Sequence, residues 1–237
     1  MNDLTHWLGP LLAMDVPALP ALWMMRIGLT LGWALVLAFL GAGLGYKLAQ
    51  KRRRLLALAL ALWTFIPGLV SPHYWLGLAF HAPSLTAMLL AGWGLRQLLF
   101  VADARAVSPS LHRAAVATLQ GLQLWLPVAL GYLLMLDTFA VLPLQIYAWG
   151  FSPMLLLGLL ALSLLPWLLG GNAPVDRVAP VWLVPAALLL FAATRLPTGN
   201  LWDALLDPWL WLILQWLLVR SLYRRFRART SPATIHG

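Results

Sequence analysis

Cysteine and glutamate are both absent from the 237-residue chain, and lysine occurs only at Lys47 and Lys51. The lack of cysteine excludes disulfide bonds, thiolate nucleophiles, thiolate zinc sites and Cys-ligated iron–sulfur clusters. Because both lysines lie near the amino end, a retinal Schiff base in a last membrane span is excluded as well. Walker, Gly-x-Ser-x-Gly and His-Glu-x-x-His patterns do not occur either. The functions that these common motifs would indicate therefore have no support in the sequence.

Charged residues are scarce and apolar residues abundant. Only 10% of the residues are charged and 62% are hydrophobic, whereas an ordinary soluble domain has about 25% and about 45–50%. The apolar stretches are long and rich in leucine and alanine, without the alternation typical of a membrane β-barrel. Since a chain that crosses a bilayer must be helical or a closed barrel, the sequence predicts an all-α, polytopic transmembrane helix bundle.

About seven spans are expected from the apolar stretches, within one transmembrane domain over 21–219. The expected spans cover residues 21–46, 55–70, 85–101, 114–136, 153–169, 180–194 and 201–218. Residues 1–20 contain acidic residues and prolines where a signal peptide has basic ones, so we interpret them as a short extracytoplasmic tail. Residues 220–237 form a basic cytoplasmic tail. Residues 74–83 are expected to be an interfacial or re-entrant segment, because His81-Ala-Pro-Ser84 interrupts the apolar pattern.

The basic run from Lys47 to Arg54 sets the orientation, because cations close to membrane spans are strongly biased toward the cytoplasm. With the amino end outside and the carboxyl end inside, only Arg26 and Arg195 of the 16 Lys and Arg residues fall outside. We infer a multi-pass protein of the bacterial inner (cytoplasmic) membrane. The net charge of +9 then needs no nucleic acid to explain it. Contacts with anionic lipid are expected at Lys51, Arg52, Arg53, Arg54, Arg224, Arg225 and Arg227.

Several local patterns indicate helix boundaries and contacts. Ser84 after Pro83 is suited to begin a helix, and Asp203 three residues after Asn200 is typical of the first turn of one. Asp207 before Pro208 marks a boundary. The run 41–45 is rich in glycine and predicts close approach between helices. Tyr147 and Trp149 suit an aromatic belt.

Six residues at the outer ends of the spans form the candidate binding group. They are His73, His81, Asp137, Arg195, Asp203 and Asp207. If they converged, His and Asp could act as an acid–base pair or bind a metal, and Arg195 could hold an anionic headgroup. The alternative is that they only mark helix ends or lie in the headgroup layer. We assign no catalytic residue, metal site or cofactor. Within the membrane, Gln120, Gln123 and Gln215 are expected to form interhelical hydrogen bonds.

Three functions remain open. A non-catalytic accessory or assembly subunit of a membrane complex fits the many tryptophans and the lack of ionisable residues at span centres. A permease for a small neutral or apolar molecule needs a cavity, for which the broken segment before Ser84 is the best indication. An enzyme on a lipid or lipid-linked substrate at the outer leaflet requires the outer group to converge, and predicts that His81→Ala or Asp137→Asn abolishes activity. The expected partners are membrane lipids and other membrane subunits.

Overall fold

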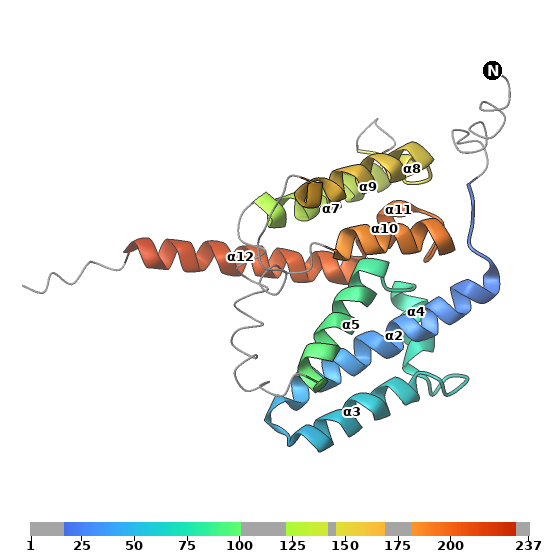
Figure 1. The fold of residues 1–237 in the computed structure, drawn as a ribbon, viewed down its shortest axis with the longest axis vertical. Coiled ribbons are helices and arrows are strands. Elements are labelled where there is room, and N and C mark those ends of the chain that lie inside the picture. Colours follow the sequence, from blue (N-terminus) through green and yellow to red (C-terminus); the bar gives the residue numbers. More distant parts are fainter. Residues whose placement is uncertain (1–16, 101–121, 142–145, 169–181, 231–237) are drawn as a thin grey trace, which may run out of the picture.

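The structure, a computed structural model, describes residues 17–100, 122–141, 146–168 and 182–230. Within these ranges the chain is helical and contains no strand, which confirms the all-α prediction. Figure 1 shows α2 to α5 on one side of the molecule and α7 to α12 on the other, with α10 and α11 beside α5.

The first half of the chain packs around α2. Its elements are α2 (Leu22–Leu44), the 3-10 helix η1 (Gly45–Lys47), α3 (Gln50–Trp63), α4 (Pro72–Phe80) and α5 (Leu85–Phe100). Helix α2 contacts α3, α4 and α5. Small side chains line the seam with α3, where Ala42 and Ala57 are buried and a Cβ on Gly41 would collide with Leu60. The predicted close approach at the glycine-rich end of α2 is therefore confirmed.

The second half contains two helix pairs. Its elements are α7 (Leu122–Thr138), α8 (Ile146–Trp149), α9 (Pro153–Leu168), α10 (Leu183–Thr194), α11 (Leu201–Leu205) and α12 (Pro208–Thr230). Helix α7 packs along α12 through Leu124, Val128, Leu210 and Leu214. Helix α9 packs on α10, and the buried Phe191 of α10 belongs to a core shared with α5 and α11.

Two of the expected spans differ from the structure in their boundaries. The span expected to end at residue 70 is helical only to Trp63, because Thr64 donates its hydroxyl to the Ala61 carbonyl at 2.6 Å and the chain turns. The span expected over 201–218 is broken into α11 and α12, since Asp207 and Pro208 begin a new helix. Helix α12 then continues to Thr230, through part of the predicted basic tail.

One helix of the described ranges, Leu22–Lys47, is long and apolar enough to cross a membrane. The other apolar helices are shorter: Leu85–Phe100, Leu124–Thr138, Pro153–Leu165 and Leu183–Thr194. The longest of them has 16 residues and extends about 24 Å, against about 30 Å for a bilayer core. The seven-span topology, its orientation and the domain boundaries therefore stay predictions.

Large hydrophobic side chains are exposed on several helices. On α12 they recur at helical spacing, at Trp209, Leu212, Ile213, Trp216, Val219, Tyr223 and Phe226. The opposite face of α12 is buried against α7. Helix α12 thus carries an apolar outward stripe, defined by these seven residues, along almost its whole length.

Candidate functional site

Asp207 joins the first turns of two helices. Its Oδ2 accepts hydrogen bonds from the Ser84 backbone N–H at 2.8 Å and from the Ser84 hydroxyl at 2.7 Å. Its Oδ1 accepts from the Leu210 N–H at 2.8 Å, and Ser84 Oγ in turn accepts from the Ala87 N–H at 3.1 Å. Asp207 and Ser84 are both buried. The predicted helix start at Ser84 and the predicted boundary at Asp207 are confirmed, and the acid is used to cap α12 and to fix α5 beside it.

Asp137 and Asp203 meet at Tyr147. The Asp137 Oδ2 accepts from the Tyr147 backbone N–H at 2.7 Å, and the Asp203 Oδ2 accepts from the Tyr147 phenol at 2.8 Å. The Thr198 hydroxyl donates to the same Asp203 oxygen at 2.5 Å. These contacts join the end of α7, the short helix α8 and the start of α11. The structure therefore brings together two of the six predicted outer residues.

Burial raises the pKa of the Tyr147 phenol above its usual value of 10.0, and the hydrogen bond to Asp203 and the negative charge of that carboxylate raise it further. Deprotonation would remove the donor of this hydrogen bond and place two negative charges side by side. Tyr147 is therefore held as a neutral donor, which suits a structural latch and not a general base.

Asn200 completes the connection between α8 and α11. Its Oδ1 accepts from the Trp202 N–H at 2.9 Å, as predicted for a residue that begins a helix, and its Nδ2 donates to the Tyr147 carbonyl at 3.0 Å. The Trp202 indole N–H donates to the Ile146 carbonyl at 2.9 Å. Sequence reasoning missed the roles of Tyr147, Thr198 and Trp202 here. The short separation between Asp137 and Tyr147 is the signal that could have indicated a turn held by the acid.

His73 lies in the first turn of α4 and faces the turn that follows α3. Its Nδ1 is 2.6 Å from both the Ser71 hydroxyl and the Thr64 carbonyl, and the Ser71 hydroxyl donates to that carbonyl at 2.9 Å. A carbonyl oxygen so close to Nδ1 requires the proton on that nitrogen, because two acceptors would repel. His73 therefore cannot take a proton from Ser71, whose side chain is fully buried. This pair closes the turn and is not a nucleophile with its base.

His81 and Arg195 each end a helix. The His81 carbonyl accepts from the Trp33 indole N–H at 2.9 Å, while its side chain is exposed. Arg195 adopts a left-handed conformation at the end of α10 and its guanidinium lies 5.3 Å from the centre of the Phe191 ring. In the described ranges no three His or Asp side chains lie close enough to hold a metal ion. Of the six outer residues, Asp137 and Asp203 thus share Tyr147 as a partner, and the other four lie at separate helix ends.

On the opposite side of the first half, the basic run holds helix ends. Arg53 is buried and its Nε donates to the Ala42 carbonyl of α2 at 2.6 Å. Arg54 donates through Nε and one terminal nitrogen to the Leu99 carbonyl of α5 at 3.0 and 2.7 Å, and the Gln50 amide donates to the same carbonyl at 2.7 Å. Cations at the carboxyl ends of helices are favourable because unpaired carbonyls and the helix dipole are negative there.

The remaining predicted lipid contacts are more open. Lys51, Arg52, Arg224 and Arg227 are exposed. Arg225 lies in α12, but its side chain is outside the described part.

Of the three glutamines predicted to form interhelical hydrogen bonds, Gln215 forms one, accepting from the Tyr132 phenol of α7 at 2.9 Å. Its buried Nε2 has no partner among the described residues. Gln120 and the side chain of Gln123 lie outside the described residues.

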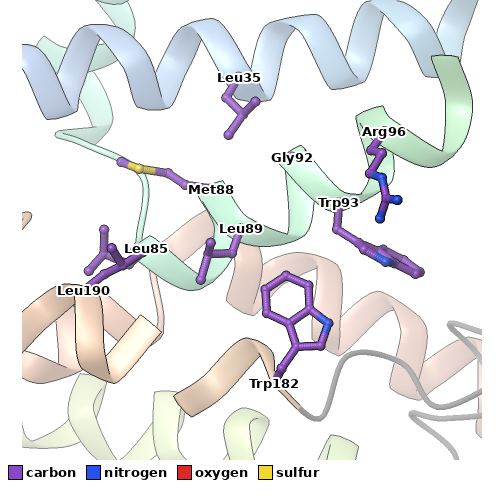
Figure 2. Close-up of a pocket in the computed structure, with 9 residues that line it drawn as sticks. All are labelled: Leu35, Leu85, Met88, Leu89, Gly92, Trp93, Arg96, Trp182 and Leu190. Carbon is purple, nitrogen blue, oxygen red and sulfur yellow. The ribbon is translucent and has the colours of Figure 1, made fainter. Parts of the chain in front are cut away.

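A cavity of about 360 Å³ lies between α2, α5 and α10. We call it the α5 groove. Figure 2 shows its lining: Leu35 of α2, Leu85, Met88, Leu89, Gly92, Trp93 and Arg96 of α5, and Trp182 and Leu190 at α10. Eight of these nine residues are apolar and one is charged. Sequence reasoning did not single out this groove, because its walls come from segments far apart in the chain.

Comparisons with protein-family models, curated proteins and solved structures found no match to this chain.

Proposed function

We propose that this chain is a multi-pass protein of the bacterial inner membrane and acts as a non-catalytic accessory or assembly subunit of a membrane complex. The observation that carries the proposal is the outward stripe of α12. Among the described helices α12 packs chiefly on α7, and Figure 1 shows it extending beyond the other helices. A long apolar surface of this kind suits lipid or a neighbouring subunit.

The use of the polar residues supports a non-catalytic role. Asp207 and Arg53 bond to backbone groups at helix ends, and Asp203 accepts from the Thr198 and Tyr147 hydroxyls that hold the turn before α11. In the closest approach to a nucleophile–base pair, Ser71 is buried, and the Thr64 carbonyl beside Nδ1 of His73 requires the proton on the nitrogen that faces Ser71. These polar groups are thus occupied in holding the fold. An accessory subunit needs nothing more of them.

Exposed hydrophobic side chains support the membrane location. On α2, which is long enough to span, Trp23, Ile27, Leu31 and Leu40 are exposed. Such surfaces are unfavourable in water and favourable in a bilayer. The basic run at Lys47–Arg54 supports the cytoplasmic side for the adjoining ends of α2, α3 and α5.

Gentle purification through a tag after Gly237, followed by native mass spectrometry, tests the proposal. We expect a second membrane or periplasmic protein at fixed stoichiometry. Trp216→Ser, on the α12 stripe, should reduce its recovery, whereas the matched Trp23→Ser on α2 should not. Recovery of the chain only as a monomer or homo-oligomer would contradict the proposal.

A permease is the second candidate, favoured by the α5 groove and by the helix breaks at residues 81–84 and 206–207. Transport of a small apolar solute into vesicles that contain only this chain, blocked by Gly92→Leu, would support a permease instead.

A further inference from the structure

The α5 groove has one charged end. Among the described residues that line it, Arg96 is the only charged one, and the adjoining wall is formed by Leu89, Met88 and Leu85. Figure 2 shows Arg96 beside Trp93, with Trp182 across from them. Arg96 is exposed and forms no hydrogen bond or ion pair within the described ranges. An exposed guanidinium without a partner at the end of the apolar α5 groove is available to a ligand that has an anionic head and an apolar tail.

The depth of Arg96 fits the inner boundary of a membrane. Arg96 lies one turn before Phe100, and the adjacent Leu99 carbonyl is held by Gln50 and Arg54 of the basic run. Trp93 and Trp182 line the groove near the same end, and indoles favour the headgroup level. Arginine at this depth can reach a phosphate while its methylene stem stays among apolar neighbours.

We propose that the α5 groove binds one anionic phospholipid of the inner leaflet. Its phosphate lies on Arg96, and one acyl chain runs along Leu89 and Met88 toward Leu85. The guanidinium can donate two parallel hydrogen bonds to phosphate oxygens. From Arg96 to Leu85 the helix rises about 16 Å, a length that an extended acyl chain can follow. The cavity of about 360 Å³ is within the size range of ligand sites.

Charge selects among lipids. The described residues of the groove lining include a cation and no acid, so a zwitterionic lipid would bring a choline group that finds no counter-charge among them. A lipid with net negative charge has no cationic headgroup that needs a partner, and its phosphate can pair with Arg96. This site is separate from the exposed cations Lys51 and Arg52, which do not line the groove. The proposal rests on the membrane location proposed above.

Native mass spectrometry of the full chain tests it, after reconstitution with equal amounts of phosphatidylglycerol and phosphatidylcholine that carry the same acyl chains. We expect one phosphatidylglycerol to be retained in preference to phosphatidylcholine. Arg96→Gln should reduce this preference about tenfold, as loss of a charge-assisted phosphate contact implies. Arg96→Lys, which keeps the charge but loses the paired geometry, should give an intermediate preference. The matched control Arg26→Gln, at an exposed arginine of α2 that neither lines the groove nor is a predicted lipid contact, should leave it unchanged.

A second variant tests the apolar part of the groove. A Cβ on Gly92 would be in ordinary contact with Leu35, at 3.5 Å, so the backbone tolerates a side chain there. Gly92→Leu should fill the groove and reduce retention of long-chain phosphatidylglycerol while sparing a short-chain analogue. Equal retention by wild type and Arg96→Gln, or an equal loss in Arg26→Gln, would overturn the proposal. Fractionation of the cells that express the same proteins tests the membrane location separately. A failure of that location is thereby distinguished from a failure of the lipid site.

Discussion

Asp207 carries more of the fold than any other acidic residue in the described ranges, because its carboxylate accepts from three donors on two helices. Asp207→Ala would leave the Ser84 and Leu210 N–H groups buried without partners. We expect a loss of about 2–4 kcal/mol in the free energy of unfolding, since each unsatisfied buried donor costs about 1–3 kcal/mol. Thermal or denaturant unfolding in detergent micelles measures this loss.

Two further variants test whether Asp207 stabilises the fold through the contact that it shares with Ser84. Asp207→Asn keeps one acceptor oxygen and should cost less than Asp207→Ala. Ser84→Ala, combined with Asp207→Ala, should cost less than the sum of the two single losses, because both remove the same contact. Additive losses, or a stable Asp207→Ala protein, would contradict the shared cap.

Tyr147 makes stability depend on pH in the alkaline range. Its pKa is raised above 10.0 in the folded chain by burial and by Asp203. The folded state therefore keeps the phenol proton more tightly than the unfolded state, so this stabilisation is complete below about pH 10 and is lost as pH rises above that value. We expect Tyr147→Phe to cost about 1 kcal/mol at pH 8, the value of one hydrogen bond.

The test for Tyr147 is the difference between variants across pH. Unfolding measured from pH 8 to 11 should show the gap between wild type and Tyr147→Phe closing above pH 10. Tyr223→Phe, on the exposed face of α12, is the control and should follow wild type throughout. A difference in stability between wild type and Tyr147→Phe that stays constant with pH would contradict a raised pKa of the Tyr147 phenol in the folded chain.

At the scale of helices, the packing of α7 on α12 depends on Gly131. A Cβ there would collide with the Trp211 indole, and that ring is fixed because its N–H donates to the Val128 carbonyl at 3.1 Å. Gly131→Ala should cost about 1–3 kcal/mol through overpacking. Gly158 on α9 has no neighbour within 4 Å of an added Cβ, so Gly158→Ala should be neutral or stabilising by up to about 1 kcal/mol.

Thermal unfolding of the two alanine variants side by side measures this difference. Both substitutions add one methyl group inside a helix, so intrinsic helix propensity is the same in each and only packing differs. Equal effects would contradict the close contact between α7 and α12.

The starts of several helices were predictable from the sequence, whereas hydrogen bonds between residues far apart in the chain were not. Ser84, Asn200 and Asp207 begin helices because their side chains bond to backbone within three residues, a property that the sequence displays directly. The turn that follows α3 is held instead by Ser71, whose hydroxyl reaches back to the Thr64 carbonyl. Tyr147 likewise acquires its role from Asp203, 56 positions away. Hydropathy patterns contain no information on such pairs.

For the whole molecule, the distribution of charge makes the strongest prediction. With the amino end outside, only Arg26 and Arg195 of the 16 basic residues lie on the outer side. We expect green fluorescent protein fused after Gly237 to fluoresce and alkaline phosphatase fused there to be inactive. Alkaline phosphatase inserted in the exposed turn at Leu69 should be active, because this turn follows α3 away from the basic run.

Neutralising the basic run gives this topology a sharper test. Arg52→Gln together with Lys51→Gln removes two exposed cations without disturbing the helix ends that Arg53 and Arg54 hold. The orientation bias should weaken, and a fraction of the phosphatase fusions after Gly237 should become active. Adding Arg53→Gln should also destabilise the seam of α2 with α3, because the Ala42 carbonyl loses its donor. Reporters that place Leu69 and Gly237 on the same side would contradict the seven-span arrangement, because an odd number of crossings separates those two positions in it.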